Sequence, residues 1–144
     1  MGLTPLHHGT LFTFTALGGY GYILGGWLNP SGSYNEYARQ NMYKFYINAN
    51  VWIEVALYPH AIYNQCTCAD EETGRLYSSG GTHKNGNHSS LRREVYYYQA
   101  SSNSWHFAKH LIWHANDHAC GIVKLTSNDE KRLYVIYGYH GGHR

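Results

Sequence analysis

The residues Val51-Trp52-Ile53-Glu54-Val55-Ala56-Leu57-Tyr58 form the clearest strand signal in the chain, and they end at Pro59. β-branched and aromatic residues favour a strand, and proline has no N–H to donate within a sheet. Side chains alternate between the two faces of a strand. One face is therefore wholly aliphatic and is expected to be buried, whereas the other carries Trp52, Glu54, Ala56 and Tyr58 and is expected to face water or a cavity.

Further strands are predicted downstream at short spacing, over residues 62–69, 94–99, 104–113, 120–125 and 132–137. Turn signals at 100–103 and 126–130 predict two hairpins within this set. Residues 78–90, which include Gly80-Gly81, are expected to form a polar loop. No fixed-period repeat is apparent in the sequence.

The N-terminal part of the chain is uncharged, because residues 1–35 contain no Asp, Glu, Lys or Arg. Its apolar run over 11–24 allows two interpretations of residues 1–26. The run has the length of the apolar part of a secretory signal, although it lacks the usual basic start. It also alternates about Gly18-Gly19, as a β-hairpin does. It is too short and too rich in Gly and Thr for a membrane span, which needs ~20 apolar residues.

A short helix is predicted over residues 34–45. Ser33 is a candidate N-cap with Glu36 three residues later, and Tyr34, Tyr37 and Ala38 recur at helical spacing. A chain of 144 residues forms one domain by default, here assigned to residues 27–144. A short N-terminal helix followed by regularly spaced strands predicts a mainly β fold, a small antiparallel β-barrel or sandwich, and closure into a barrel would remove the strand edges.

Composition and motifs exclude several classes of function. Charged residues make up only 14% of the chain and the net charge is +2, with no continuous basic surface for nucleic acid. No Gly-x-Ser-x-Gly, phosphate loop or His-Glu-x-x-His is present, so we expect neither enzymatic activity nor a cofactor. The three cysteines allow one bridge with one thiol left over. Cys66 and Cys68 are poorly spaced to bridge each other in a strand, so Cys120 must be a partner if a bridge forms.

The order of several motifs resembles the tick salivary lipocalins, the family that includes the histamine-binding proteins. The similar motifs span about residues 34–139 and comprise Tyr43-Lys44-Phe45, residues 51–58, Cys66, residues 95–98, Asn103-Ser104-Trp105, residues 117–123 and residues 133–137. The resemblance implies a secreted, monomeric lipocalin-like barrel over residues 27–144 that binds a small molecule in its interior. Members of the family usually continue into a C-terminal segment with further cysteines, so this chain looks truncated, and marginal stability is expected.

The candidate ligand-binding residues are Trp52, Glu54, Tyr58, Tyr97, Trp105, Lys109 and Trp113. Glu54 could neutralise an ammonium group while the aromatic residues form the walls, since aromatic rings attract cations. Tyr58 aligns with a ligand-contacting tyrosine of the histamine binders. Val135 stands where those binders carry an acid, which favours a carboxylate ligand with Lys109 as its partner. The alternative is that Trp52 and Trp113 are core residues and that Glu54 faces solvent.

A metal site is a second hypothesis. His106, His110, His114 and His118 are spaced four apart, which on a helix would place them on one face as ligands for Zn, Cu or Ni. On a strand, neighbours four apart lie ~13 Å from each other and cannot share an ion. The β-rich surroundings favour the strand, in which case these histidines form an exposed polar face.

The resemblance to the tick salivary lipocalins implies a secreted salivary protein of immune evasion. It would sequester a host inflammatory mediator, either a leukotriene-like or fatty-acid-like lipid or a biogenic amine such as histamine or serotonin. The alternatives are a His-rich metal-binding protein and a structural β-domain without a ligand. We expect no nucleic-acid partner and no stable membrane insertion. The glycosylation sequon Asn87-His88-Ser89 is consistent with secretion.

Overall fold

A computed structural model describes residues 9–28, 37–85, 88–124, 126, 130–136 and 138. Over these residues the chain is all-β and contains no helix, and it therefore holds no helix that could cross a membrane. Its strands are β1 (Gly9–Thr10), β2 (Thr13–Leu17), β3 (Tyr20–Leu24), β4 (Trp27–Leu28), β5 (Tyr37–Ala38), β6 (Met42–Tyr46), β7 (Val51–Val55), β8 (Ile62–Tyr63), β9 (Cys66–Asp70), β10 (Arg75–Ser79), β11 (Thr82–Asn85), β12 (His88–Leu91), β13 (Glu94–Gln99), β14 (Ser104–His110), β15 (Ala119–Val123) and β16 (Arg132–Ile136).

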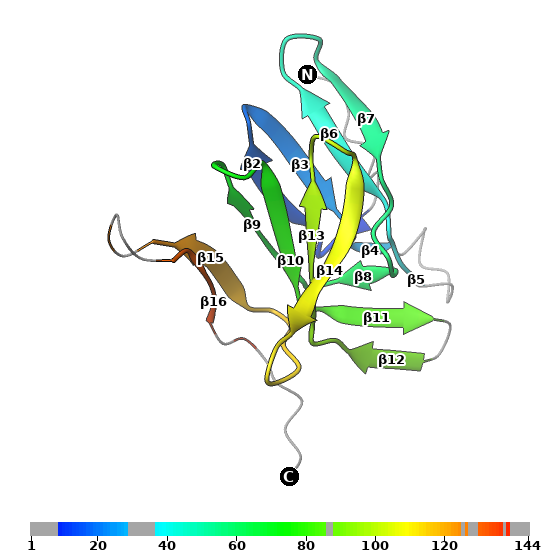
Figure 1. The fold of residues 1–144 in the computed structure, drawn as a ribbon. Coiled ribbons are helices and arrows are strands. Elements are labelled where there is room, and N and C mark those ends of the chain that lie inside the picture. The colour runs from blue at the N-terminus through cyan, green and yellow to red at the C-terminus, as the bar shows by residue number, and fades with distance from the viewer. Residues whose placement is uncertain are drawn as a thin grey trace.

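Two four-stranded antiparallel sheets dominate the structure (Figure 1). The first has the order β2-β3-β6-β7, and the second has the order β9-β10-β13-β14. In each sheet the strands follow one another up and down, with small extensions built from β4 and β5 or from β11 and β12. The predicted hairpin over 94–113 is confirmed as β13 and β14, although β14 ends at His110.

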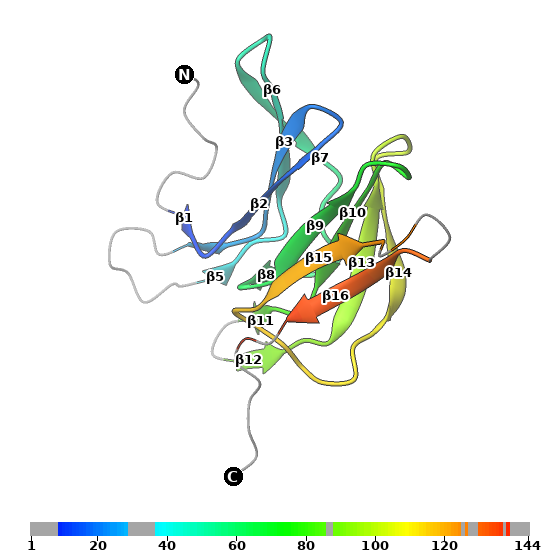
Figure 2. The same ribbon diagram turned by 90° about the vertical axis from the view of Figure 1, so that its left-hand side faces the viewer.

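A third sheet consists of β15 and β16, which confirms the second predicted hairpin. β9 contacts both β2 and β15, so the three sheets lie side by side with β2, β9 and β15, the first strand of each sheet, as neighbours (Figure 2). Two contacts join those strands: a hydrogen bond of 2.6 Å between the hydroxyls of Thr13 and Thr67, and the Cys66–Cys120 disulfide. Four-stranded sheets arranged radially on their inner strands are the construction of a β-propeller.

This arrangement overturns the predicted lipocalin-like barrel, because none of the sheets in the described part of the chain closes on itself. The barrel was inferred from antiparallel strands at regular spacing. That spacing is shared by barrels, sandwiches and propellers, since all three are built from consecutive hairpins. Barrels, sandwiches and propellers differ in which strands become neighbours across the fold. Local sequence patterning carries no information about those neighbours.

The two large sheets are also repeats of each other, which the sequence analysis missed. Gly25-Gly26 follows β3 as Gly80-Gly81 follows β10, and Trp52 of β7 occupies the position of Trp105 in β14. The two Gly-Gly pairs stand about 55 positions apart, close to the ~50 residues of a kelch-type propeller blade. The repeat was missed because few other residues are shared and because residues 78–90 were interpreted as a loop. They contain the end of β10, then β11, and most of β12.

Gly80 shows why these positions are glycines. Its φ is +58°, and a Cβ there would collide with the carbonyl oxygen of Ala115 and lie 2.9 Å from the His118 ring. We expect Gly80→Ala to lower the free energy of unfolding by about 2–3 kcal/mol, from the left-handed backbone and the forced shift together. Gly121→Ala is the control, because a Cβ at Gly121 meets nothing within 4 Å. Equal urea midpoints for the two variants would contradict this account.

The hydrophobic core lies between the two large sheets. Tyr22, Leu24 and Met42 of the first sheet face Leu76 and Tyr98 of the second, and each is at most 2% exposed. The Tyr22 and Tyr98 rings meet at 6.0 Å. Alternation explains the pattern, since residues at every second position of β3 and β10 point toward this interface.

Two local predictions were wrong. Residues 34–45 form no helix where they are described, because they include β5 and β6; the capping residues Ser33 and Glu36 lie outside the described part. The aromatic run of β6 pairs with β3 and β7, and this tertiary pairing overrides the helical spacing.

The expected buried face of residues 51–58 is also wrong, since Val51, Ile53 and Leu57 are 43–48% exposed. β7 is the outermost strand of its sheet and is covered poorly.

Candidate functional site

The seven predicted ligand-binding residues do not converge on one site. Trp52 and Glu54 lie on β7, where Trp52 packs on Phe45 and Glu54 accepts a hydrogen bond from Asn41. Both side chains lie on the face of the first sheet that points away from the second, as the register places Phe45 opposite Trp52 and Tyr43 opposite Glu54. They are therefore separated from the other candidates by the core.

Tyr58 and Trp105 are structural. Tyr58 is 2% exposed, and its ring meets the Trp105 ring edge-on at 4.8 Å. The Trp105 indole donates a hydrogen bond of 3.1 Å to the carbonyl of Ala56. Burial raises the pKa of the Tyr58 hydroxyl above its usual range, which is the expected behaviour of a core tyrosine. Through these contacts, Tyr58 and Trp105 attach the segment that follows β7 to the second sheet.

Tyr97 points to the opposite face of the second sheet. It stacks on His106 with a ring separation of 5.0 Å, and the Arg75 guanidinium lies 4.4 Å from its ring centre. Cation–π contacts of this kind stabilise a partly exposed aromatic surface. Tyr97 and His106 thus form part of the sheet surface, and neither lines the cavities of about 290, 180 and 200 Å³.

Lys109 and Trp113 do come together, in an open cavity of about 290 Å³ between the end of β14 and β16. We call this cavity the Lys109 groove. One wall is the segment from β14 into the following loop, and the other wall belongs to β16 on the third sheet. Its lining residues are Lys109, His110, Leu111, Ile112, Trp113, His114, Ala115, Leu133 and Val135.

The loop wall of the groove is held by backbone hydrogen bonds. Leu111 N–H donates to Arg93, Ala115 N–H donates to Arg92, and the Ala115 carbonyl accepts from Gly81. A register shift in the pairing of β13 with β14 leaves Ala108 without an opposite residue, so Lys109 pairs with Val95. Bulges of this kind change the direction of the following side chains. The loop is therefore anchored at both ends, while Ile112 and Trp113 at its tip are 84% and 65% exposed.

The positive charge of Lys109 has no acidic partner among the described residues, whereas that of Lys131 does. Lys131 makes ion pairs with Asp70 and, at 2.7 Å, with Glu72. Burial alone would raise the pKa of Asp70, but hydrogen bonds from Lys131 and Thr73 outweigh it and lower the pKa. Lys109 borders the same cavity of about 180 Å³ as Asp70 and Lys131. Lys109 is thus a cation of this region that can meet an outside anion.

The four histidines of the metal hypothesis are dispersed. His106 stacks on Tyr97, His110 packs against Phe107, and His114 lies in the loop wall of the groove. His118 contacts the Ser79 hydroxyl at 2.9 Å. Its burial lowers the pKa of the imidazole, which outweighs the opposing effects of Asp117 and Ser79. Among the described residues, no three His, Cys, Asp or Glu side chains are grouped to hold a metal ion.

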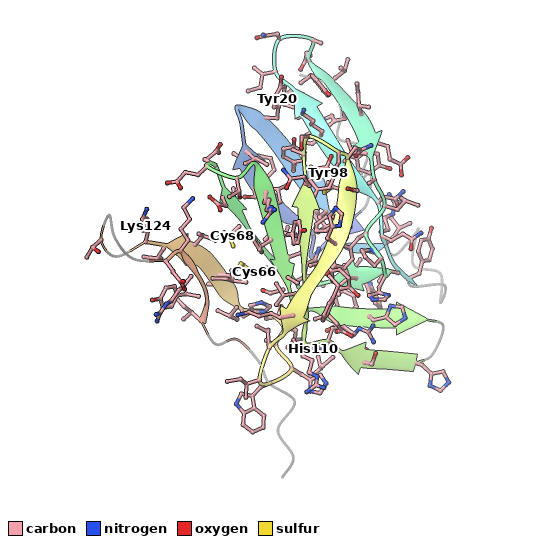
Figure 3. The ribbon with its side chains drawn as sticks, in the orientation of Figure 1. Tyr20, Cys66, Cys68, Tyr98, His110 and Lys124 are labelled. Atoms are coloured by element: carbon pink, nitrogen blue, oxygen red, sulfur yellow. A yellow bond between two sulfur atoms is a disulfide. The ribbon has the colours of Figure 1, made fainter. Side chains whose placement is uncertain are left out.

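The cysteines are arranged as one bridge and one buried thiol. The Cys66–Cys120 disulfide joins β9 to β15, which confirms that Cys120 is a partner, and Figure 3 shows Cys66 and Cys68 between these strands. Cys68 is buried, and this burial raises the pKa of its thiol to about 11. A thiol of this kind is protonated and unreactive at neutral pH.

Sequence reasoning found two residues of the groove and missed most of the others. Leu133 was assigned to a strand without a role, Val135 was considered only as the residue that replaces an acid of the histamine binders, and Ile112 was assigned to the end of the strand over 104–113. The Ile112-Trp113 pair indicates a binding role only through its exposure, which the structure supplies, because adjacent large apolar side chains exposed to water are uncommon without such a role. The loop after β14 and β16 line the same cavity, which is a tertiary arrangement that residue spacing does not reveal.

The fold defines the class of protein: an all-β chain made of propeller-like blades. Among solved structures, it is similar to YjhT, with a TM-score of 0.66 and 15% sequence identity. The match covers 78% of this chain but only 41% of the YjhT chain, so this chain spans less than half of that protein's length. No family model matches the sequence, and no curated protein does. At this identity the likeness concerns the fold.

Proposed function

We propose that this protein is a binding module that takes an apolar carboxylate, such as a fatty-acid-like or leukotriene-like molecule, in the Lys109 groove. The observation that carries the proposal is the meeting of Lys109, whose charge is unpaired among the described residues, with the apolar side chains of Ile112, Trp113 and Leu133. Ligand sites are mostly apolar with a few polar groups that fix orientation. Here the ammonium group would hold the carboxylate, and the loop and β16 would contact the hydrocarbon.

The electrostatics of the groove favour an anion over an amine. Its lining contains one lysine and two histidines, His110 and His114, and no Asp or Glu. Glu54, the residue expected to neutralise an ammonium group, lies on β7 and is engaged with Asn41. Desolvating an amine beside Lys109 would be unfavourable, because like charges repel strongly where water is excluded. Histamine and serotonin are therefore poor candidates for this groove.

The Cys66–Cys120 disulfide supports a location outside the reducing cytosol. Disulfides persist in secreted proteins and in oxidising compartments, whereas cytosolic thiols are kept reduced. Capture of a lipid mediator outside cells accordingly remains the proposed role. Asn87 of the glycosylation sequon lies outside the described residues.

The proposal predicts that Lys109→Gln weakens carboxylate binding about 10- to 100-fold, because a hydrogen bond to a charged group contributes about 1.5–3 kcal/mol. The measurement is a fluorescence titration with arachidonate, followed through tryptophan quenching. Trp113→Phe should remove most of the quenching, since Trp113 is the tryptophan that lines the groove.

Two controls make the titration specific. Lys124→Gln removes an exposed lysine that directly follows β15 and does not line the groove, and it should leave the affinity unchanged. Arachidonyl alcohol, which has the same chain without the carboxylate, should bind wild type and Lys109→Gln equally weakly. Saturable binding of arachidonate that is insensitive to Lys109→Gln, or no binding at all, would refute the proposed site.

A further inference from the structure

The two ends of the row of sheets expose apolar faces. We call the face of the first sheet that points away from the second the head face; it carries Phe14, Phe45 and Trp52. We call the face of the third sheet that points away from the second the tail face; it carries Val123, Tyr134 and Ile136. Phe14 is 60% exposed and Ile136 is 65% exposed. Contiguous apolar surface of this kind marks an interaction site.

The internal repeat relates the head face to a buried surface of the same chain. Phe45 and Trp52 occupy the positions of Tyr98 and Trp105 in the second sheet. The ring centres of the first pair lie 4.8 Å apart and those of the second pair 5.4 Å apart. Tyr98 and Trp105 belong to the surface of the second sheet that packs on the first sheet. The head face is therefore a second copy of a surface that is used inside the molecule.

The repeat relates the tail face to the other half of that interface. Arg132-Leu133-Tyr134 in β16 repeats Arg75-Leu76-Tyr77 in β10, and the register of the sheets makes Tyr134 and Ile136 equivalent to Tyr22 and Leu24 in β3. Tyr22 and Leu24 are both 2% exposed, because the second sheet covers them. The equivalent side chains on the tail face are 38% and 65% exposed.

We propose that a second copy of this chain covers these faces, with the head face of one copy packed on the tail face of the next. The occupant follows from the internal interface: the tail face carries Tyr134 and Ile136, the equivalents of the Tyr22 and Leu24 that the second sheet covers, and the head face presents Phe45, the equivalent of the Tyr98 that meets Tyr22. Such a contact is heterologous, and repeated contacts of this kind close into a ring when the rotation permits.

The first test is the mass of the 144-residue chain by native mass spectrometry and sedimentation. The proposal predicts a defined multiple of 16.5 kDa at micromolar concentration. Phe14→Lys on the head face and Ile136→Lys on the tail face should each prevent ring closure and shift the population to monomer. Both positions are exposed, so both variants should fold, which circular dichroism checks. Ile47→Lys, at an exposed position in the turn between β6 and β7, is the matched control and should assemble like wild type.

A mixing experiment identifies the geometry of the contact. Phe14→Lys retains an intact tail face and Ile136→Lys retains an intact head face, so an equimolar mixture should form a 1:1 dimer although each variant alone is monomeric. No such rescue is possible if the contact joins two head faces or two tail faces. A monomeric wild type at 100 µM would overturn the proposal and point to further blades or another protein as the cover. An oligomer that both substitutions leave intact would overturn it as well.

Discussion

Replacing both Cys66 and Cys120 by alanine is expected to lower the free energy of unfolding by about 4 kcal/mol, because the disulfide closes a loop with a sequence separation of 54 residues. In this model of disulfide stabilisation, the bridge restricts the unfolded chain and so lowers its entropy. Loss of the bridge should also weaken the attachment of the third sheet to the second. The bridge links β9 of the second sheet to β15 of the third in addition to the backbone between β14 and β15, and without it the β15–β16 hairpin is held mainly by its packing on β9.

Thermal unfolding measures this loss as a fall in Tm of roughly 10 °C for a chain of this size. Dithiothreitol supplies the control: it should lower the Tm of wild type toward that of the double variant and leave the double variant unchanged. Cys68 contributes nothing to this comparison, because its thiol is buried and free in both proteins. If wild type has the same Tm with and without reductant, the bridge makes no contribution to stability.

Replacing Tyr98 by alanine is expected to cost about 3–5 kcal/mol, the range for removing a large aromatic side chain from a core. Tyr98 is 2% exposed and contacts Tyr22 and Trp105 between the two large sheets. Its hydroxyl also donates a hydrogen bond of 2.9 Å to Asn103, the turn residue between β13 and β14. The substitution would therefore open a cavity and loosen that turn together.

Phe45→Ala is the matched control for Tyr98→Ala, because Phe45 occupies the equivalent position in the first sheet. Its face is uncovered in the single chain, so its loss should cost about 1–2 kcal/mol, well below the full cavity cost. Urea unfolding at a low protein concentration, where the proposed contact between copies is absent, gives both values. Similar losses for the two variants would mean that the head face is packed as tightly as the core.

Alternation was sufficient to predict several of the strands. The aromatic and β-branched runs that became β7, β13, β14, β15 and β16 were recognised because their period of two is a local property of the backbone. The same local reasoning failed for β5 and β6, where tyrosines also matched helical spacing. It failed again around Gly80-Gly81, which bends a strand pair instead of opening a loop. In both cases a partner strand distant in sequence decides the conformation.

At the candidate site, too, residue types could be interpreted from the sequence, whereas the positions of the side chains depended on the tertiary structure. Lys109 was assigned as a carboxylate partner from its residue type, and the groove in which it lies with Trp113 exists only because β16 packs beside β14. Trp52, Glu54, Tyr58 and Trp105 were grouped with them because a barrel would direct all these side chains inward. In a row of blades, alternate positions point toward different neighbouring sheets. Trp52 and Trp105, though equivalent in the repeat, therefore experience different environments.

The sequence by itself determined that this protein is built from antiparallel hairpins and that Cys120 must take part in any disulfide. These properties depend on side-chain type and on short spacings. Only the tertiary structure decided that the hairpins form separate sheets standing on β2, β9 and β15, and not one closed barrel. The physical reason is that propeller blades and barrels bury the same alternating faces at the same local cost, and the choice between them is made by packing between residues more than 50 positions apart, as in Thr13 with Thr67 and Cys66 with Cys120.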